Sequence, residues 1–290
     1  MYFTISSSFI GLKNMLLSND KNANFEIFEI LRMTSFFANV GRIFLNFLQG
    51  TGHLIIFINQ TITMGIRPPY YSRQILKQII NIGYFSLPVV GLTAMFTGMV
   101  LALQSYTGFA RFSAEGAVAT VVVLSITREL APVLAGLMVA GRIGAAIAAE
   151  LGTMRVTEQI DALSTLSTDP LQYLVMPRVI AGIFTLPLLV LVADIIGVFG
   201  GYLVSIYKLG FNPGNYLHQT LQYLKAIDVI SGLIKASVFG FCISIMGCYH
   251  GYYSKGGAQG VGSATTNAVV SSSILILIFN YLLTAVFFDK

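Results

Sequence analysis

The chain has 290 residues, of which 55% are hydrophobic and only 10% are charged, and its formal net charge is +5. Soluble domains carry about 25% charged residues, so this composition argues against a soluble protein and favours a membrane protein. The basic residues lie singly between apolar runs and form no patch, which argues against nucleic acid as a partner.

The first part of the chain predicts a tail followed by a surface helix. Residues 1–24 lack the basic start, apolar run and cleavage site of a signal peptide, and we expect a disordered tail there. Residues 25–66 place Phe, Ile and Leu at helical spacing, which predicts an interfacial amphipathic helix in the cytoplasmic leaflet. The alternative is a transmembrane span over residues 43–64, although His53 and Gln60 disfavour it.

Five apolar segments follow, each long enough to cross the roughly 30 Å hydrocarbon core of a bilayer. We expect these spans at residues 79–103, 117–149, 179–207, 229–250 and 267–288. If the N-terminus lies inside, the inner segments hold ten Lys and Arg residues and the outer segments hold four. Because Lys and Arg favour the cytoplasmic side, this count places the N-terminus in the cytoplasm and the C-terminus outside. The sequence therefore predicts an all-α membrane protein with five transmembrane helices.

Two of the connections have recognisable composition. Residues 208–228 read as a polar connection with Asn212-Pro213-Gly214 as a turn. Residues 251–263 read as a glycine-rich loop, but not as a phosphate loop, because that motif needs Gly-Lys followed by Ser or Thr. The sequence also shows no metal-ligand cluster and no Ser/His/Asp arrangement, so we expect no metal, no cofactor and no catalytic residue.

Charged residues inside the apolar segments are the first functional candidates. Arg128 and Glu129 lie within the second segment, where each charge costs roughly 2.5–3.5 kcal/mol on insertion. They form either a cavity that handles a charged headgroup or a structural network between helices, and the sequence leaves both open. For Arg142, near the inner end, the structural interpretation is favoured. Asp194, in the third segment, is a similar intramembrane acid.

Small residues four apart, including Gly247 and Gly251 in the fourth segment, predict close helix approach in three segments. Two of these segments carry the residues predicted for helix packing. They are Gly141, Ala145 and Ala149 in the second, and Gly197 and Gly201 in the third.

Residues 150–170 predict a short amphipathic helix on the cytoplasmic side. Val156, Ile160, Leu163 and Ser167 lie on one stripe, and Arg155, Glu158, Gln159 and Ala162 lie on another. Asp169-Pro170 predicts a helix N-cap followed by proline at the first helical position. From the residues alone, this helix either docks in a groove of a soluble partner or is an ordinary interfacial loop.

Long stretches of the chain resemble a known family, the MlaE-type permeases, which include bacterial phospholipid-transport permeases and their plastid counterparts. The resemblance covers roughly residues 74–288. It runs through GMVLALQ (98–104), SAEG (113–116), RELAPVLAGLMVAGRIGAAIAAELGTMRVTEQIDAL (128–163), DPLQYLVMPRVIAG (169–182), DIIGVFGGYL (194–203) and GGAQGVGSATTNAVV (256–270).

The resemblance implies a permease domain at 67–290 preceded by an elbow helix, with a cytoplasmic coupling helix between the second and third spans. It also implies a homodimer that works with a cytoplasmic or stromal ABC ATPase and a lipid-carrier protein on the opposite face. ATP would be bound by the partner subunit, and the chain itself would be no enzyme. The membrane would be a plastid inner envelope or a bacterial inner membrane.

The resemblance also assigns roles to residues. The lipid cavity would involve Leu103, Gln104, Arg128 and Glu129. The coupling helix would use Glu150, Gly152, Arg155, Glu158, Gln159, Asp161 and Leu163. We expect glycerophospholipid or a related lipid to be moved between membranes. The alternative is an ion-gradient-driven secondary transporter that uses Glu129 and Asp194 as ion sites.

Overall fold

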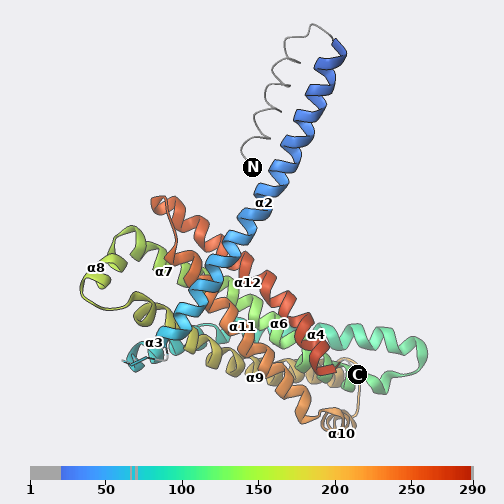
Figure 1. The fold of residues 1–290 in the computed structure, drawn as a ribbon. Helices are drawn as coiled ribbons and strands as arrows, with labels where there is room; N and C mark the ends of the chain where they lie inside the picture. The colour runs from blue at the N-terminus through green and yellow to red at the C-terminus, as the bar shows by residue number, and fades with distance from the viewer. Residues whose placement is uncertain (1–20, 66, 69–70, 289–290) are drawn as a thin grey trace. The chain divides into compact units, whose positions relative to one another are not determined.

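The computed structural model describes residues 21–65, 67–68 and 71–288, and within them the chain forms helices without any strand (Figure 1). The main helices are α2 (Lys21–Gly65), α3 (Ser72–Gly83), α4 (Leu87–Phe109), α5 (Val118–Ser125), α6 (Ala131–Val139), α7 (Ala145–Val156), α8 (Gln159–Thr165), α9 (Met176–Tyr207), α10 (Pro213–Tyr223), α11 (Ala226–Tyr252) and α12 (Gly257–Phe288). Short 3₁₀ turns η1 (Ala110–Phe112) and η2 (Glu115–Ala117) follow α4, and wider π-helical turns η3 (Ile126–Leu130), η4 (Ala140–Gly144) and η5 (Leu171–Val175) interrupt the long helices.

The chain divides into two compact units, residues 1–57 and residues 58–290. Of the first unit, the structure describes the part of α2 that begins at Lys21, four residues before the expected helix start. The disordered tail expected at 1–24 is therefore too long by four residues, and its remaining part, residues 1–20, lies outside the described residues. An interfacial position for α2 stays a prediction.

Five helical segments of the described chain are long and apolar enough to cross a membrane, which confirms the predicted number and order of spans. They are Ser72–Phe112, Val118–Val156, Leu171–Tyr207, Ala226–Tyr252 and Gly257–Phe288. Each begins or ends beyond the apolar block that predicted it, because the helices continue past the hydrocarbon-like part of the sequence.

Helix α11 is the central helix of the second unit. It packs against α9, α12 and α7, and Phe239, Ile243 and Cys248 on it are buried. Helices α4 and α9 approach each other closely, because a Cβ atom added at Gly98 would collide with the carbonyl group of Gly197. Glycines are used in this way in membrane bundles, where close backbone approach increases the van der Waals contact between helices.

The first span is broken between α3 and α4, and Arg142 bridges the break. Its Nη2 donates to the Asn81 carbonyl at 2.7 Å and to the Ser86 hydroxyl at 2.6 Å. A helix end leaves carbonyl groups without helical partners, and Arg142 supplies a donor to one of them. This contact supports the structural interpretation of Arg142.

The polar connection expected at 208–228 contains a helix, so that prediction was incomplete. Asn212 Oδ1 accepts hydrogen bonds from the backbone N–H groups of Gly214 at 2.9 Å and Asn215 at 3.2 Å. The Asn-Pro-Gly sequence is therefore the N-cap and first turn of α10 rather than a chain reversal.

The glycine-rich loop expected at 251–263 is also shorter than predicted. Helix α11 continues to Tyr252 and α12 begins at Gly257, which leaves residues 253–256 as the connection. Gly256 and Gly257 have φ angles of +95° and +66°, which glycine adopts without the steric cost of a side chain. Two adjacent residues of this kind let the chain reverse within a few residues.

Candidate functional site

The predicted pair Arg128 and Glu129 lies on the wide turn η3, and a proline explains part of its geometry. In an α-helix the Arg128 carbonyl would accept from the N–H group of residue 132, but Pro132 has no N–H. The N–H of Ala131 instead donates to the Ile126 carbonyl, five residues back. Turns of this type are frequent at functional sites because they free backbone groups and redirect side chains.

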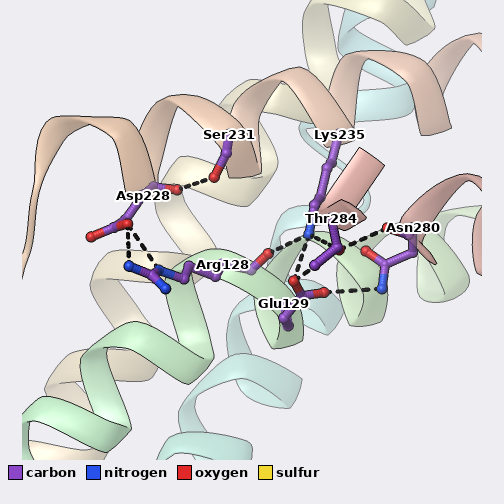
Figure 2. A network of polar contacts seen from close by, with 7 residues as sticks. All are labelled: Arg128, Glu129, Asp228, Ser231, Lys235, Asn280 and Thr284. Carbon is purple, nitrogen blue, oxygen red and sulfur yellow. Dashed lines mark hydrogen bonds and ion pairs between the residues drawn. The ribbon is translucent and has the colours of Figure 1, made fainter. Parts of the chain in front are cut away.

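Lys235 of α11 supplies the donor that Pro132 cannot. Its Nζ donates to the Arg128 carbonyl at 2.9 Å, to Glu129 Oε1 at 2.7 Å and to the Thr284 hydroxyl at 2.8 Å (Figure 2). An ammonium group has three N–H donors, so all of them are used. The Lys235 side chain has no exposed surface, and such a charge is tolerated only when it is paired in this way.

Glu129 joins three spans through its carboxylate. Besides the contact with Lys235, its Oε2 accepts from Asn280 Nδ2 at 3.0 Å, and its Oε1 lies 3.0 Å from the Thr284 hydroxyl. Asn280 and Thr284 are on α12, near its C-terminal end, and Figure 2 shows both side chains pointing toward Glu129. The second, fourth and fifth spans are therefore held together at this point.

Arg128 forms a second ion pair beside the first. Its Nε and Nη2 lie 2.8 Å and 2.7 Å from Asp228 Oδ1. Asp228 is fully buried in the first turn of α11, where the helix dipole favours negative charge, and its Oδ2 accepts from the Lys225 backbone N–H at 3.0 Å. The guanidinium carbon also lies 4.5 Å from the ring centre of Phe288, within range of a cation–π contact.

We call these six residues, Arg128, Glu129, Asp228, Lys235, Asn280 and Thr284, the charge cluster. Its two ion pairs are asymmetric in exposure. Asp228 and Lys235 are fully buried, whereas about a third of the Arg128 and Glu129 side-chain surface, 34% and 37%, remains exposed. The cluster therefore presents one cation and one anion outward, each held in place by a buried counter-charge.

The other two residues predicted for a lipid cavity lie on α4. Leu103 is half-buried and Gln104 is exposed, near the end of α4, which is followed by the turn η1 with Arg111. The charge cluster of Figure 2 contains neither of them. Their role in a cavity stays a prediction.

The predicted coupling segment is divided into two helices. Glu150, Gly152 and Arg155 lie on α7, whereas Gln159, Asp161 and Leu163 lie on α8. Glu158 lies between the two helices with a φ angle of +58°, an uncommon conformation for a residue other than glycine. The two stripes expected along one continuous helix are therefore interrupted at residues 157–158.

Polar contacts attach this segment to the spans. Arg178 at the start of α9 is nearly fully buried and lies 2.7 Å from Glu150, and Arg155 pairs with Asp161 at 2.7 Å across the gap between α7 and α8. Ile160 is buried while Gln159 and Asp161 on the same short helix are exposed. Helix α8 is thus anchored on one side and presents an acidic and polar surface on the other.

The small residues predicted for helix packing fall into two groups. A Cβ added at Gly197 would lie 3.2 Å from the Ala94 carbonyl oxygen, and one at Gly201 would lie 2.7 Å from Val122 Cγ1, so both face neighbouring helices. A Cβ added at Gly141 would meet no atom within 4 Å, and Ala145 and Ala149 are partly exposed. The 141–149 stripe therefore faces outward from the second unit.

Sequence reasoning identified Arg128 and Glu129 but missed their partners. Asp228 falls in a predicted connection and Lys235 in the fourth predicted span, and neither is among the predicted site residues. A signal was present, because Lys235 is the one charged residue within the block 229–250 and needs a counter-charge at that depth. Asn280 and Thr284 gave no comparable signal.

The sequence matches the model of the family described as "Permease MlaE" over residues 75–286. The chain belongs to the MlaE permease family. Since the match covers the charge cluster, the coupling segment and all but a few end residues of the five spans, the chain is an ABC transporter permease and a multi-pass membrane protein.

Relatives from bacteria and plants share most of the chain. A "Probable ABC transporter permease protein" of Rickettsia bellii is 65% identical over 250 residues, which is 86% of this chain and 96% of the relative. The protein TRIGALACTOSYLDIACYLGLYCEROL 1 of Arabidopsis thaliana, described as chloroplastic, is 38% identical over 234 residues, 81% of this chain and 67% of the relative. The "Intermembrane phospholipid transport system permease protein MlaE" of Haemophilus influenzae is 36% identical over 217 residues, 74% of this chain and 82% of the relative.

Proposed function

We propose that this permease moves a glycerophospholipid or a related lipid between membranes, driven by a separate ATPase. The observation that carries the proposal is the charge cluster, in which a cation and an anion, each about one-third exposed, rest on buried counter-charges within the membrane-spanning segments. The name of the Haemophilus influenzae relative, which specifies intermembrane phospholipid transport, supports the same class of substrate.

The exposed part of Arg128 is suited to a lipid phosphate. A guanidinium group offers several N–H donors in one plane and binds phosphate through charge-assisted hydrogen bonds. Asp228 and the Phe288 ring fix its position. Glu129 lies beside it and would face the amine of a zwitterionic headgroup, while the acyl chains lie against apolar helix faces and the end of α4 at Leu103 and Gln104.

The ATPase would dock at α8. Gln159 and Asp161 offer it an exposed polar surface, and the neighbouring Glu158 adds a second acidic side chain. Movement of α8 would reach two spans, because Arg155 links α8 to α7 and Glu150 links α7 to Arg178 of α9. A second copy of the permease, ATP bound by the ATPase, and a lipid-carrier protein on the opposite face would complete the transporter.

We further propose a bacterial inner membrane as its location. The Rickettsia bellii relative shares 65% of residues, against 38% for the chloroplastic protein of Arabidopsis thaliana. The plastid inner envelope is the alternative for a chain with relatives in both groups.

Reconstitution tests the transport proposal. The permease, its ATPase and a fluorescent phospholipid are placed in liposomes, and lipid transfer to acceptor vesicles is followed with and without ATP. We expect Arg128→Gln to reduce ATP-dependent transfer at least tenfold, since a charge-assisted contact contributes on the order of 1.5–3 kcal/mol. Arg111→Gln, which changes an exposed arginine outside the cluster, is the matched control.

Two outcomes would contradict the proposal. The first is no lipid movement by the wild-type complex with ATP present. The second is transfer that ignores ATP and collapses with the proton gradient, as expected for a secondary transporter. The pairing of Glu129 with Lys235 argues against Glu129 as the ion site of that alternative, because Lys235 balances its charge inside the protein.

A further inference from the structure

A cavity of about 400 Å³ lies between α9, α10, the turn η3 and the start of α11. None of the six residues of the charge cluster lines it, although its lining residues Thr127 and Val229 are next to Arg128 and Asp228 in the chain. Its wall is almost entirely apolar and includes Val123, Ile195 and Leu217. Its size falls within the range of small-ligand pockets, which combine apolar walls with a few polar groups that orient the ligand.

Two polar groups in this wall, the carboxylate of Asp194 and the hydroxyl of Tyr216, have no hydrogen-bond partner among the described residues. Asp194 of α9 lines the cavity and is 6% exposed, and both of its carboxylate oxygens lack a hydrogen-bond partner among the described residues. Buried polar groups are paired in the great majority of cases, and an unpaired one requires an explanation. An acid that was merely structural would be expected to have a donor from a neighbouring helix, as Glu129 has.

The nearby hydroxyl groups do not supply that donor. Thr127 donates its hydroxyl proton to the Val123 carbonyl at 2.8 Å, and Thr220 donates to the Tyr216 carbonyl at 2.9 Å. Each hydroxyl has one proton, so both donors are already used within their own helices. The Tyr216 hydroxyl, which also lines the cavity, has no partner and therefore does not donate to Asp194. No described residue donates to this carboxylate, and a ligand hydroxyl in the cavity would supply the donor.

The cavity is accessible from the side that would face lipid. Phe199 and Ile195, which line it, are 52% and 65% exposed, and Leu217 and Leu221 of α10 are also exposed. Asp194 is eight residues before Tyr202 on α9, which places it roughly 12 Å deeper along the helix axis. A ligand that reaches Asp194 must bring its polar group into the apolar part of the membrane.

We propose that this cavity binds an uncharged, single-chain lipid whose hydroxyl group donates a hydrogen bond to Asp194. An uncharged head is required because a charged head would be costly at that depth. A single chain fits because a cavity of this volume holds the part of one chain nearest the hydroxyl group, while the rest of the chain extends through the lipid-facing opening. The site is independent of the proposed transport, and its occupancy is measured without ATP or an ATPase.

The test uses tryptophan as a reporter, because the chain has none of its own. Phe199→Trp places a reporter in the cavity wall, and Phe184→Trp places one on the exposed surface of the same helix, 65% exposed and outside the cavity lining. The full chain is placed in lipid nanodiscs, and quenching is measured with dibrominated stearyl alcohol. The matched probe is the methyl ether of the same alcohol, which has the same chain and no donor.

We expect the alcohol to quench the Phe199→Trp variant at a mole fraction about fivefold to tenfold lower than the ether, the effect of losing one hydrogen bond. The Phe184→Trp variant should respond equally to both probes. Adding Asp194→Leu to Phe199→Trp should remove the preference for the alcohol, and Asp194→Asn, which can still accept a hydrogen bond, should retain most of it.

Three results would overturn the proposal. Equal quenching of the Phe199→Trp variant by the alcohol and the ether would show that no donor is recognised. A preference that survives Asp194→Leu would place the donor contact elsewhere. An absence of quenching at the Phe199→Trp reporter would show that the cavity is closed to lipid, as it would be if a second copy of the chain covered it.

Discussion

Lys235 is an ammonium group without exposed surface, and its three donors are all used by the Arg128 carbonyl, Glu129 and Thr284. Its partner Glu129 keeps 37% of its side-chain surface exposed and can be hydrated on that side. The two members of the pair therefore differ in what happens when the other is removed. Loss of the glutamate leaves a buried charge, whereas loss of the lysine leaves a charge near an open surface.

Glu129→Gln should destabilise the protein more than Lys235→Met. Removing one partner of a buried pair costs about 3–5 kcal/mol when the remaining charge is fully buried, and less when it can reach water. The double variant should recover part of the stability of Glu129→Gln, because no buried charge remains. Thermal unfolding in detergent measures all three, and equal losses for the two single variants would contradict the asymmetry.

Among the individual residues, the sequence predicted one member of each ion pair in the charge cluster. Arg128 and Glu129 are conspicuous because they interrupt a long apolar block. Asp228 lies at a helix start, where an acid has an ordinary capping role, and Asn280 and Thr284 are polar residues of a kind that membrane helices carry for many reasons. Which distant side chains meet depends on helix packing, and no spacing along the chain encodes it.

The crossing of α4 and α9 is the tightest contact between elements that the glycine positions reveal. Gly98 faces the Gly197 carbonyl, and Gly200 faces the Met95 carbonyl, so each helix contributes a glycine opposite a backbone oxygen of the other. Neither helix can accept a methyl group there without moving apart.

Gly98→Ala should therefore destabilise the bundle, by about 1–3 kcal/mol or more, as overpacking of a rigid site does. Gly108→Ala, on the same helix, is the control, because a Cβ there meets no atom within 4 Å. Thermal unfolding of the two purified variants compares them. If Gly98→Ala is as stable as Gly108→Ala, the helices do not cross at this distance in solution.

Helix α10 depends on its N-cap, since Asn212 satisfies two N–H groups of the first turn. We expect Asn212→Ala to cost about 1 kcal/mol and to raise hydrogen exchange in α10. Asn215→Ala, which changes an exposed side chain in the same helix and leaves the cap intact, should have little effect. Unchanged exchange in Asn212→Ala would mean that packing alone holds the helix.

The elements themselves were predicted well where apolar length dominates and less well where Gly and Pro occur. All five spans follow from hydropathy. Asn, Pro and Gly mark turns in soluble proteins, but here they occur in helices. Asn212 and Pro213 open α10, because the first turn of a helix accepts proline. Gly260 and Gly262 lie inside α12, because a membrane helix accepts glycine.

For the whole molecule, a single span that contains α9 lies between α8 and α10 and therefore places them on opposite sides of the membrane. The two native cysteines, Cys242 and Cys248, are buried and should not react with a membrane-impermeant maleimide. In intact cells, Asn215→Cys on α10 should be labelled, whereas Thr165→Cys on α8 should be labelled only after lysis. The reverse pattern would invert the predicted orientation and remove α8 from the side where an ATPase binds.

The orientation and the assembly are the properties least visible in one chain. The excess of Lys and Arg on the inner side lies mostly before the first span, so the later connections add little to the orientation. The residues that would contact a second copy or an ATPase, such as the Gly141–Ala149 stripe and Asp161, are exposed in the single chain. The family membership supplies the class of transporter, and the geometry supplies the residues on which its partners would act.

The wide turn η3 has a consequence for how the second span can change by single-residue insertion or deletion. A π-helical turn holds one residue more than the α-helical turn it replaces, so deleting one residue of Ile126–Leu130 would convert it to regular helix. The remainder of the span would then stay in phase with its neighbours, as it would after a deletion inside the second wide turn of this span, η4 (Ala140–Gly144). Elsewhere in the span, a deletion would rotate every later side chain by about 100°. The extra residue in this turn thus orients the Glu129 side chain toward Lys235, while the helical segments before and after the turn keep the same faces packed against their neighbours.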